Sequence, residues 1–178
     1  MSHTFTKNHQ HIIFSTAERR KLIDKQFQPK LWAYVAGICR NHDMFVRAIG
    51  GVEDHIHILL ELPPTLAVAA AVRTIKSNSS KWVNELGRRF AWQKGYAAFS
   101  VSASNNAAVE RYVRSQEQHH RKMTFEDEFI GILKKHGIAL DPKYVFDYCR
   151  ASGASLISHL FPSASALGYH WFAPSALD

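Results

Sequence analysis

The sequence has little cysteine and no long apolar segment. Its 178 residues include only Cys39 and Cys149, which are far apart and not in metal-ligand spacing. This excludes a disulfide framework and a zinc ribbon, and it is typical of a protein in a reducing cytosol. No stretch reaches the roughly 18 apolar residues of a membrane span, and the N-terminus lacks the apolar core of a signal peptide. We therefore expect a cytoplasmic protein with no membrane segment.

Hydrophobic and basic side chains are abundant instead. Hydrophobic residues make up 46% of the chain and aromatic residues 12%, which argues against disorder and fits one globular domain with its own core. Lys and Arg number 22 against 15 Asp and Glu, a formal charge of +7. This balance suits a polyanionic partner such as nucleic acid. It also suits many ordinary soluble proteins, so charge alone does not decide the function.

The predicted elements follow the order β-α-β-β-α-β, with two further helices. Apolar runs bounded by turn residues predict strands at 10–15, 45–49, 55–62 and 99–102. Helical spacing predicts helices at 29–42, at 65–86 with Thr65 as the cap, after Ser104, and from Thr124 to Gly137. Right-handed connections turn this order into an α+β fold, a ferredoxin-like βαββαβ antiparallel sheet with helices on one face plus additional C-terminal helices.

The chain divides into a domain at 1–150 and a C-terminal tail at 151–178. Residues 151–177 contain no Lys, Arg, Asp or Glu and are rich in Ala and Ser. The serines, prolines and histidines of this segment argue against a membrane span. The segment is either a mobile tail or a part of the chain that folds back onto the domain.

Two histidines flank one apolar residue in the predicted strand at 55–62. Side chains alternate along a strand, so His55 and His57 share one face, about 7 Å apart, and can bind one metal ion together. A chain with 11 histidines can contain such a pair by chance or as core residues. Imidazoles on an apolar strand are nevertheless costly to bury without partners, and a divalent ion supplies one for both. Asp54, just before the pair, is predicted to face away from it and to serve the turn.

Tyr112 and Gln116 stand four residues apart, which places them on one face of a predicted helix. The amide oxygen of Gln116 is a hard donor that, with imidazole, suits Mg²⁺ or Mn²⁺ and leaves a coordination position open for substrate. His120, one turn further on, is an alternative ligand. The simpler alternatives are a solvent-facing Gln116 and a Tyr112 that belongs to the core.

A phenol close to a metal is a candidate nucleophile. The pKa of tyrosine is normally about 10, so a nearby cation is needed to favour the phenolate at neutral pH. Attack of Tyr112 on a phosphodiester would leave a phosphotyrosyl link on the 5′ side and a free 3′ hydroxyl, while the metal polarises the scissile phosphate. The covalent intermediate would allow rejoining to another strand without an external energy source.

One face of the predicted helix at 65–86 is polar. Its side chains are Arg73, Lys76, Ser77, Ser80, Lys81 and Asn84. Such cations and hydroxyls can position a nucleic-acid backbone without reading bases, although an ordinary solvated face has the same composition. Trp92 and Tyr96 could stack on unpaired bases or belong to the core. The charged run at 18–21 is predicted to be a solvated connection.

Four blocks of sequence carry a resemblance to a known family. They are residues 50–57, residues 75–82, residues 92–102, and residues 112–116 leading into 119–122. In this order they resemble the HUH superfamily, specifically the single-tyrosine transposases of the IS200-like class and the REP-associated tyrosine transposases, over about residues 8–148. The resemblance implies His55 and His57 as metal ligands, Tyr112 as the nucleophile and Gln116 as the third ligand. It also implies a single-stranded, hairpin-bearing DNA substrate and a homodimer in which Tyr112 could act in trans.

Three functional hypotheses follow. The first is a transposase that cleaves and rejoins single-stranded DNA through Tyr112 with Mg²⁺ or Mn²⁺. The second is a metal-dependent phosphodiester hydrolase in which His55, His57 and His120 hold the metal and water attacks, so that Tyr112 is structural. The third is a non-catalytic nucleic-acid-binding module on a ferredoxin-like sheet, and the absence of an RNA-recognition-type aromatic signature at residues 10–14 and 99–102 weighs against it. We adopt the first as our prediction.

Overall fold

The computed structural model describes residues 5–139. The predicted tail at 151–178 and the predicted end of the domain near residue 150 lie outside these residues. Within residues 5–139, no helix is long and apolar enough to cross a membrane.

Four antiparallel strands form one sheet. They are β1 (Asn8–Ser15), β2 (Phe45–Gly51), β3 (His55–Leu62) and β4 (Ala97–Val101), in the order β2-β3-β1-β4. The central strands β1 and β3 pair along their whole length, from Asn8 opposite Leu62 to Ser15 opposite His55. Helices connect β1 to β2 and β3 to β4. This is the ferredoxin-like arrangement, so the predicted fold is confirmed.

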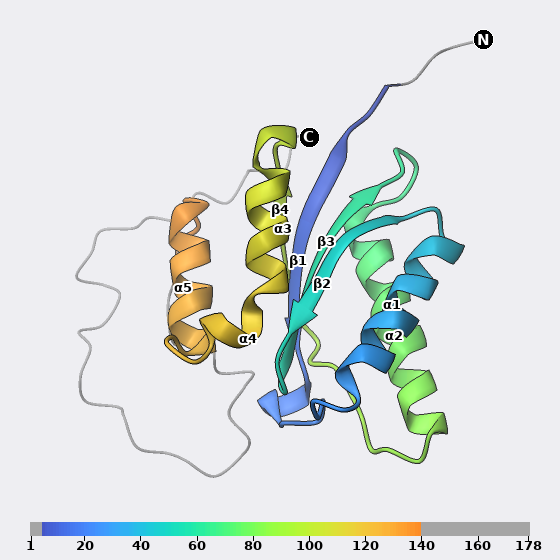
Figure 1. Cartoon of the computed structure of the whole chain (residues 1–178). Helices are drawn as coiled ribbons and strands as arrows, with labels where there is room; N and C mark the ends of the chain where they lie inside the picture. The colour runs from blue at the N-terminus through green and yellow to red at the C-terminus, as the bar shows by residue number, and fades with distance from the viewer. Residues whose placement is uncertain (1–4, 140–178) are drawn as a thin grey trace, which may run out of the picture.

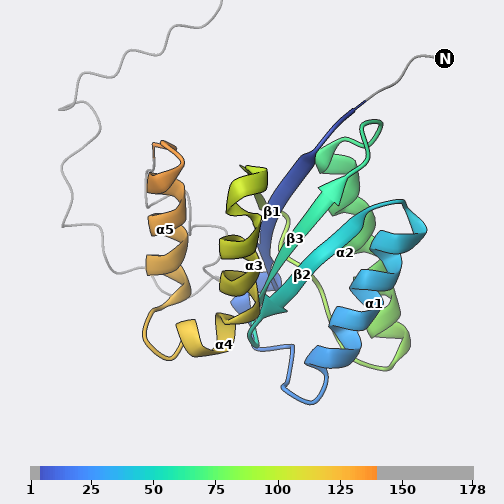
Figure 2. The ribbon, with the colours of Figure 1, turned by 45° about the horizontal axis from the view of Figure 1, so that its top comes forward.

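Helices cover both faces of the sheet (Figure 1, Figure 2). On one face lie α1 (Gln28–Asn41) and α2 (Val68–Glu85), as predicted. The additional helices that follow β4 cover the other face, and they are α3 (Asn106–Arg114), α4 (Gln116–His119) and α5 (Phe125–Lys135). Two short 3-10 turns, η1 (Ala17–Arg19) and η2 (Ala103–Asn105), follow β1 and β4.

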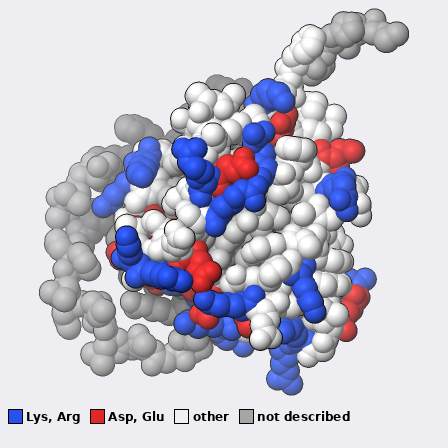
Figure 3. Space-filling view, viewed as in Figure 1, with Lys and Arg blue, Asp and Glu red and all other residues white. Residues whose placement is uncertain are grey.

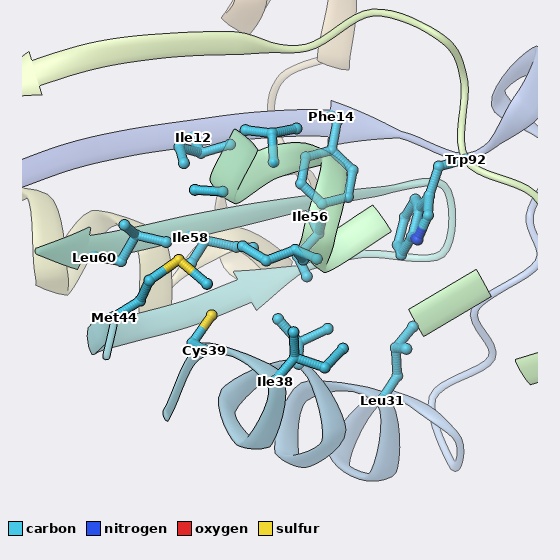
Figure 4. Packing of buried hydrophobic residues seen from close by; sticks show 14 of the residues in the cluster. Ile12, Phe14, Leu31, Ile38, Cys39, Met44, Ile56, Ile58, Leu60 and Trp92 are labelled. Carbon is cyan, nitrogen blue, oxygen red and sulfur yellow. The ribbon is translucent and has the colours of Figure 1, made fainter. Parts of the chain in front are cut away.

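Strand alternation separates the apolar core from a histidine-lined face. Every second residue in the middle of β1 and β3 points toward α1 and α2 and is buried in the main core (Figure 4). These residues are Ile12, Phe14, Ile56, Ile58 and Leu60. The intervening positions point to the opposite face and include His11, His55 and His57. The alternation that builds the core therefore also gathers buried histidines, His9 among them, on the face that α3, α4 and α5 cover.

The tyrosine-bearing helix is shorter than predicted. Its last residue is Arg114, and Ser115 (φ −96°, ψ 14°) separates it from α4, which begins at Gln116. The Ser115 hydroxyl donates to the Tyr112 carbonyl (3.1 Å), a local bond that competes with the helical ladder. Tyr112 and Gln116 therefore lie on two helices that meet at a corner, and the prediction of one shared helix is wrong.

The predicted helix starts have mixed outcomes. Thr124 is the N-cap of α5, and its hydroxyl accepts a hydrogen bond from the Asp127 amide (3.2 Å), as predicted. The other two predicted caps are wrong because a turn precedes each helix. Thr65 lies in a turn and α2 begins only at Val68, while Ser104 lies inside η2.

Gly50 determines how closely β2 and α3 approach each other. A Cβ atom at this position would lie 1.8 Å from the Val113 carbonyl oxygen. Gly50 also stands opposite His57 in the β2–β3 ladder. The missing side chain therefore lets α3, which carries Tyr112, come down onto the histidine-lined face.

Gly50→Ala is expected to lower the free energy of unfolding by about 2 kcal/mol or more, because β2 or α3 must move to avoid the clash. The matched control is Gly37→Ala in the interior of α1, where nothing lies within 4 Å of the new Cβ. This control is expected to raise the free energy of unfolding by about 0.5–1 kcal/mol. Urea unfolding measures both changes. Equal stability of Gly50→Ala and the wild type would contradict the close approach of α3.

Candidate metal and tyrosine site

His55 and His57 lie completely buried on the face of β3 that α3, α4 and α5 cover. Both residues are 0% exposed. Ile56 and Ile58, on the other face of the same strand, are anchored in the main core and fix the register of the pair. Two buried imidazoles need polar partners, because a buried polar group without one destabilises the fold.

The Nδ1 atom of each histidine has a partner within the protein. His55 Nδ1 donates to Asp54 Oδ1 (2.7 Å), and His57 Nδ1 lies 3.0 Å from His11 Nε2. Asp54 lies in the turn before β3, as predicted, and because the strand has not yet begun there, its side chain reaches His55 rather than facing away. With Nδ1 as the donor in both rings, the two Nε2 atoms keep their lone pairs, which is the tautomer that a metal ion requires.

Glu128 of α5 brings a carboxylate to the histidine pair. It is 3% exposed, and its Oε2 lies 3.1 Å from His120 Nε2 and 3.5 Å from His57 Nε2 without forming a hydrogen bond to either. Ligand atoms of His55, His57, His120 and Glu128 all lie within 4.8 Å of one another. Ligands about 2.1 Å from an ion are at most about 4.2 Å apart, so small movements would close this cluster around one cation.

The buried polar atoms that lack hydrogen-bond partners gather around the same cluster. They include His55 Nε2, His57 Nε2, Gln116 Oε1, His119 Nε2, His120 Nε2 and Glu128 Oε2. Unpaired polar atoms are costly in a protein interior, and nitrogen lone pairs with carboxylate and amide oxygens are the donors that a divalent ion would satisfy. The residues therefore fit a metal ion.

The electrostatics of the cluster also favour a cation. Burial lowers the pKa of His57 to about 4 and lowers the pKa of His55, so both imidazoles are neutral at pH 7. Burial alone would raise the pKa of Glu128, but the contacts from His120 and His57 outweigh it and hold this pKa well below its usual range. Burial opposes the charge of His120, yet its contact with Glu128 raises the pKa of this histidine.

Tyr112 reaches the cluster from the same chain as the histidines. Its hydroxyl donates to Glu128 Oε1, and its ring centroid lies 5.9 Å from that of His57. Gln116, 1% exposed, donates from Nε2 to the same Glu128 oxygen (3.0 Å), so the corner at Ser115 does not separate the two side chains. Burial, followed by the Glu128 carboxylate, raises the pKa of Tyr112 well above its usual range. The phenol stays neutral until positive charge offsets Glu128.

Sequence reasoning missed Glu128. Its signal was the pattern of α5, where this carboxylate interrupts an apolar stripe formed by Phe125, Phe129 and Ile132. A charged residue at a core position of an amphipathic helix is unusual and indicates a buried partner. His120, predicted as an alternative ligand, is in the cluster.

The residues predicted to bind DNA lie on the other face of the sheet, along α2. Arg73, Lys76, Ser77 and Ser80 line a groove of about 410 Å³ between α2 and residues 90–96, whereas Lys81 is outside it and lies 3.9 Å from Glu85. Lys76 Nζ donates to the carbonyl oxygens of residues 93, 94 and 95, so it holds this loop in place.

The aromatic residues of this loop have different environments. Trp92 is 8% exposed, and its Nε1 donates to Ser79 Oγ (2.8 Å), so it belongs to the core. Tyr96 is 41% exposed and lines the groove. On the face seen in Figure 3, Lys and Arg are interspersed with Asp and Glu. This face is therefore not uniformly basic. On α3, Arg114 pairs with Glu110 (2.9 Å).

Comparisons with known proteins agree with this architecture. The family described as IS200-like transposases matches residues 4–116, more than half of the chain. The chain is 25% identical over 124 residues to the transposase for insertion sequence element IS200 of Salmonella typhimurium, covering 65% of this chain and 81% of that protein. It is 22% identical over 114 residues to the ISDra2 transposase TnpA of Deinococcus radiodurans, covering 60% of this chain and 81% of that protein.

A solved structure shares the fold. A Deinococcus radiodurans R1 protein described as a transposase has a TM-score of 0.51 and 18% identity, over 64% of this chain and 93% of that chain. A REP-associated tyrosine transposase bound to a REP hairpin has a TM-score of 0.49 and 15% identity, over 64% and 68%. Because the family match spans the whole sheet together with His55, His57 and Tyr112, the chain belongs to the IS200-like transposases, the single-tyrosine class of the HUH superfamily.

Proposed function

We propose that this transposase cleaves and rejoins single-stranded DNA with Tyr112 as its nucleophile. The observation that carries the proposal is the convergence of the Tyr112 hydroxyl and the buried His55–His57 pair on one carboxylate, Glu128. A nucleophile next to a buried cluster of potential metal ligands is the arrangement that phosphoryl transfer requires.

In the proposed site, His55 and His57, through Nε2, and oxygens of Glu128 and Gln116 would hold a divalent ion, Mg²⁺ or Mn²⁺. Gln116 Oε1 is buried without a partner, which supports the sequence-based assignment of Gln116 as a ligand. Glu128 joins this set from α5. When bound, the ion would polarise the scissile phosphate and offset the charge of Glu128 beside the phenol.

The reaction follows from the direction of the Tyr112 hydroxyl. The hydroxyl donates a hydrogen bond to Glu128 Oε1, which orients the phenol oxygen toward the site. The new bond joins the Tyr112 oxygen to the 5′ phosphorus, the bond from phosphorus to the 3′ oxygen breaks, and the proton that the phenol loses ends on the leaving 3′ oxygen. Attack by the 3′ hydroxyl of another strand reverses these steps and frees Tyr112.

We propose that Tyr112 acts in cis, because its hydroxyl contacts Glu128 of its own chain. The homodimer and the cytoplasmic location stay predictions.

We further propose that the α2 groove holds hairpin-bearing single-stranded DNA. Arg73 and Lys94 supply exposed positive charge along it, and Tyr96 offers a ring on which an unpaired base can stack. Of the predicted set, Lys76 contributes indirectly by holding the loop, and Ser77 and Ser80 line the wall. Lys81 takes no part in this groove.

One observation favours a second candidate function. His120 lies in the cluster with His55 and His57, which suits the metal-dependent hydrolase in which water attacks the phosphodiester. Tyr112 would then support the site only through its hydrogen bond to Glu128. The two functions differ in whether DNA becomes attached to the protein.

Tyr112→Phe is expected to abolish the covalent protein–DNA product, because only the attacking oxygen is removed. Labelled single-stranded hairpin libraries are incubated with Mn²⁺, and the products are separated on denaturing gels and identified by mass spectrometry. Tyr34→Phe, on α1 at the other face of the sheet, is the matched control and should form the adduct normally. Normal cleavage by Tyr112→Phe would transfer the assignment to the hydrolase. Normal cleavage in excess chelator would contradict the metal site.

The pH dependence of Mn²⁺ affinity is expected to identify the ligand set. Burial lowers the pKa of His57 to about 4, so protons compete little for this residue above pH 6, and burial also lowers the pKa of His55. A ligand set that lacks His120 should therefore lose less than about 3-fold in Mn²⁺ affinity between pH 7.5 and pH 6.0. If His120 is a ligand, its raised pKa gives a loss of up to about 10-fold per pH unit, and His120→Gln flattens the profile. Electron paramagnetic resonance of free Mn²⁺ measures the affinity.

Arg73→Ala is expected to weaken binding of single-stranded hairpin DNA about 5-fold. It should also reduce the slope of log affinity against log salt concentration by about one, which corresponds to one released ion. Lys30→Ala, an exposed position on α1, removes the same charge away from the groove and should change neither quantity. Fluorescence anisotropy at several salt concentrations measures both. Equal effects of the two substitutions would mean that the groove does not hold DNA.

A further inference from the structure

The turn η1 contains two consecutive residues in a strained backbone conformation. Glu18 (φ 56°) and Arg19 (φ 52°) are both in the left-handed region, although each carries a Cβ atom. Side chains are unfavourable there, and such strain persists only where surrounding contacts enforce it. The contacts of Arg19 therefore need an explanation.

The Arg19 guanidinium bridges two separate elements. Its Nη2 donates to Asp54 Oδ2 (2.9 Å) at the start of β3, and its Nη1 donates to Glu126 of α5. The guanidinium carbon also lies 4.8 Å from the centroid of the Phe125 ring. The side chain is only 20% exposed, so the expectation of a solvated connection at residues 18–21 is wrong for Arg19.

Each of these contacts leads directly to the candidate metal site. The other oxygen of Asp54 accepts the hydrogen bond from His55 Nδ1 (2.7 Å). The Phe125 ring lies 4.5 Å from the His55 ring, centroid to centroid. Glu126 is two residues before Glu128 on the same helix. One guanidinium thus connects a histidine of β3 with the helix that supplies the carboxylate.

The remaining contacts of α5 explain why this bridge is needed. Its buried apolar side chains, Phe125 and Leu133, join Ile13 and Phe99 in a cluster far smaller than the main core, and the partly buried Ala97, Phe129 and Ile132 pack against it. A helix with so little buried apolar surface is held weakly by packing alone. A planar guanidinium can bind carboxylates on two elements at once, which a lysine ammonium does with less geometric definition.

We propose that Arg19 is a positioning residue that assembles the metal site, orienting His55 through Asp54 and docking α5 so that Glu128 reaches the histidine pair. This inference rests on the proposed metal site. It assigns a role to the strained turn, because the left-handed backbone at residues 18 and 19 directs the guanidinium between β3 and α5.

The test compares Mn²⁺ affinity and backbone hydrogen exchange in the full-length protein. Arg19→Gln is expected to weaken Mn²⁺ binding at least 10-fold and to accelerate exchange in α5. Arg19→Lys keeps the positive charge but lacks the planar guanidinium that binds two carboxylates at once. It should restore less than half of the Mn²⁺ affinity that Arg19→Gln loses, on a logarithmic scale. Arg20→Gln is the matched control, because Arg20 is 56% exposed and its ion pair is with Glu18 (3.8 Å). This control should bind Mn²⁺ like the wild type.

One glycine variant and one alanine variant of Arg19 separate its effect on the metal site from its effect on the stability of the protein. Both Arg19→Gly and Arg19→Ala remove the guanidinium and should lose the same Mn²⁺ affinity. Arg19→Gly relieves the left-handed strain, so its urea midpoint should lie above that of Arg19→Ala. Wild-type Mn²⁺ affinity in Arg19→Gln and Arg19→Gly would overturn the role of Arg19 while leaving the metal site intact. A wild-type protein that binds no Mn²⁺ would overturn the proposed metal site, and the inference with it.

Discussion

The carboxylate of Glu128 is the interaction on which the geometry of the site depends. It accepts hydrogen bonds from Tyr112 and Gln116 and lies within ion-pair distance of His57, His119 and His120. The helices after β4 and the histidine strand have no other common meeting point of this kind among residues 5–139. A buried anion is stable only if positive charge or hydrogen-bond donors approach it. The same demand explains why the cluster suits a cation and why the carboxylate favours the neutral phenol.

Much of the fold was predictable because its determinants are local. Alternation along β3 separates Ile56 and Ile58 from His55 and His57, and this period alone placed the two histidines on one face. The glycines at 50 and 51 and the prolines at 63 and 64 delimit the hairpin in the sequence. Element order then left few topologies, since crossover connections have a fixed hand. The family match at residues 4–116 covers this same region.

The missed parts depend on contacts between distant segments. Glu128 lies beyond the matched residues, and its role becomes visible only when α5 packs against the sheet. Asp54 precedes the first residue of β3, so strand alternation did not fix its direction. Lys76 resembles a free cation on a helix face, yet the loop at 93–95 folds back over its amine. Ser115 breaks the tyrosine helix through one side-chain bond, which helical periodicity does not reveal.

The placement of the α2 groove and Tyr112 on opposite faces of one sheet has a consequence for substrate length. Layers packed on a sheet lie about 10 Å from it on each side, so the two locations are separated by roughly two such layers. A nucleic-acid strand that touches both has to travel around an edge of the sheet. Under the proposed function, the length of that path would set the number of unpaired nucleotides between a duplex bound in the groove and the phosphate that Tyr112 attacks.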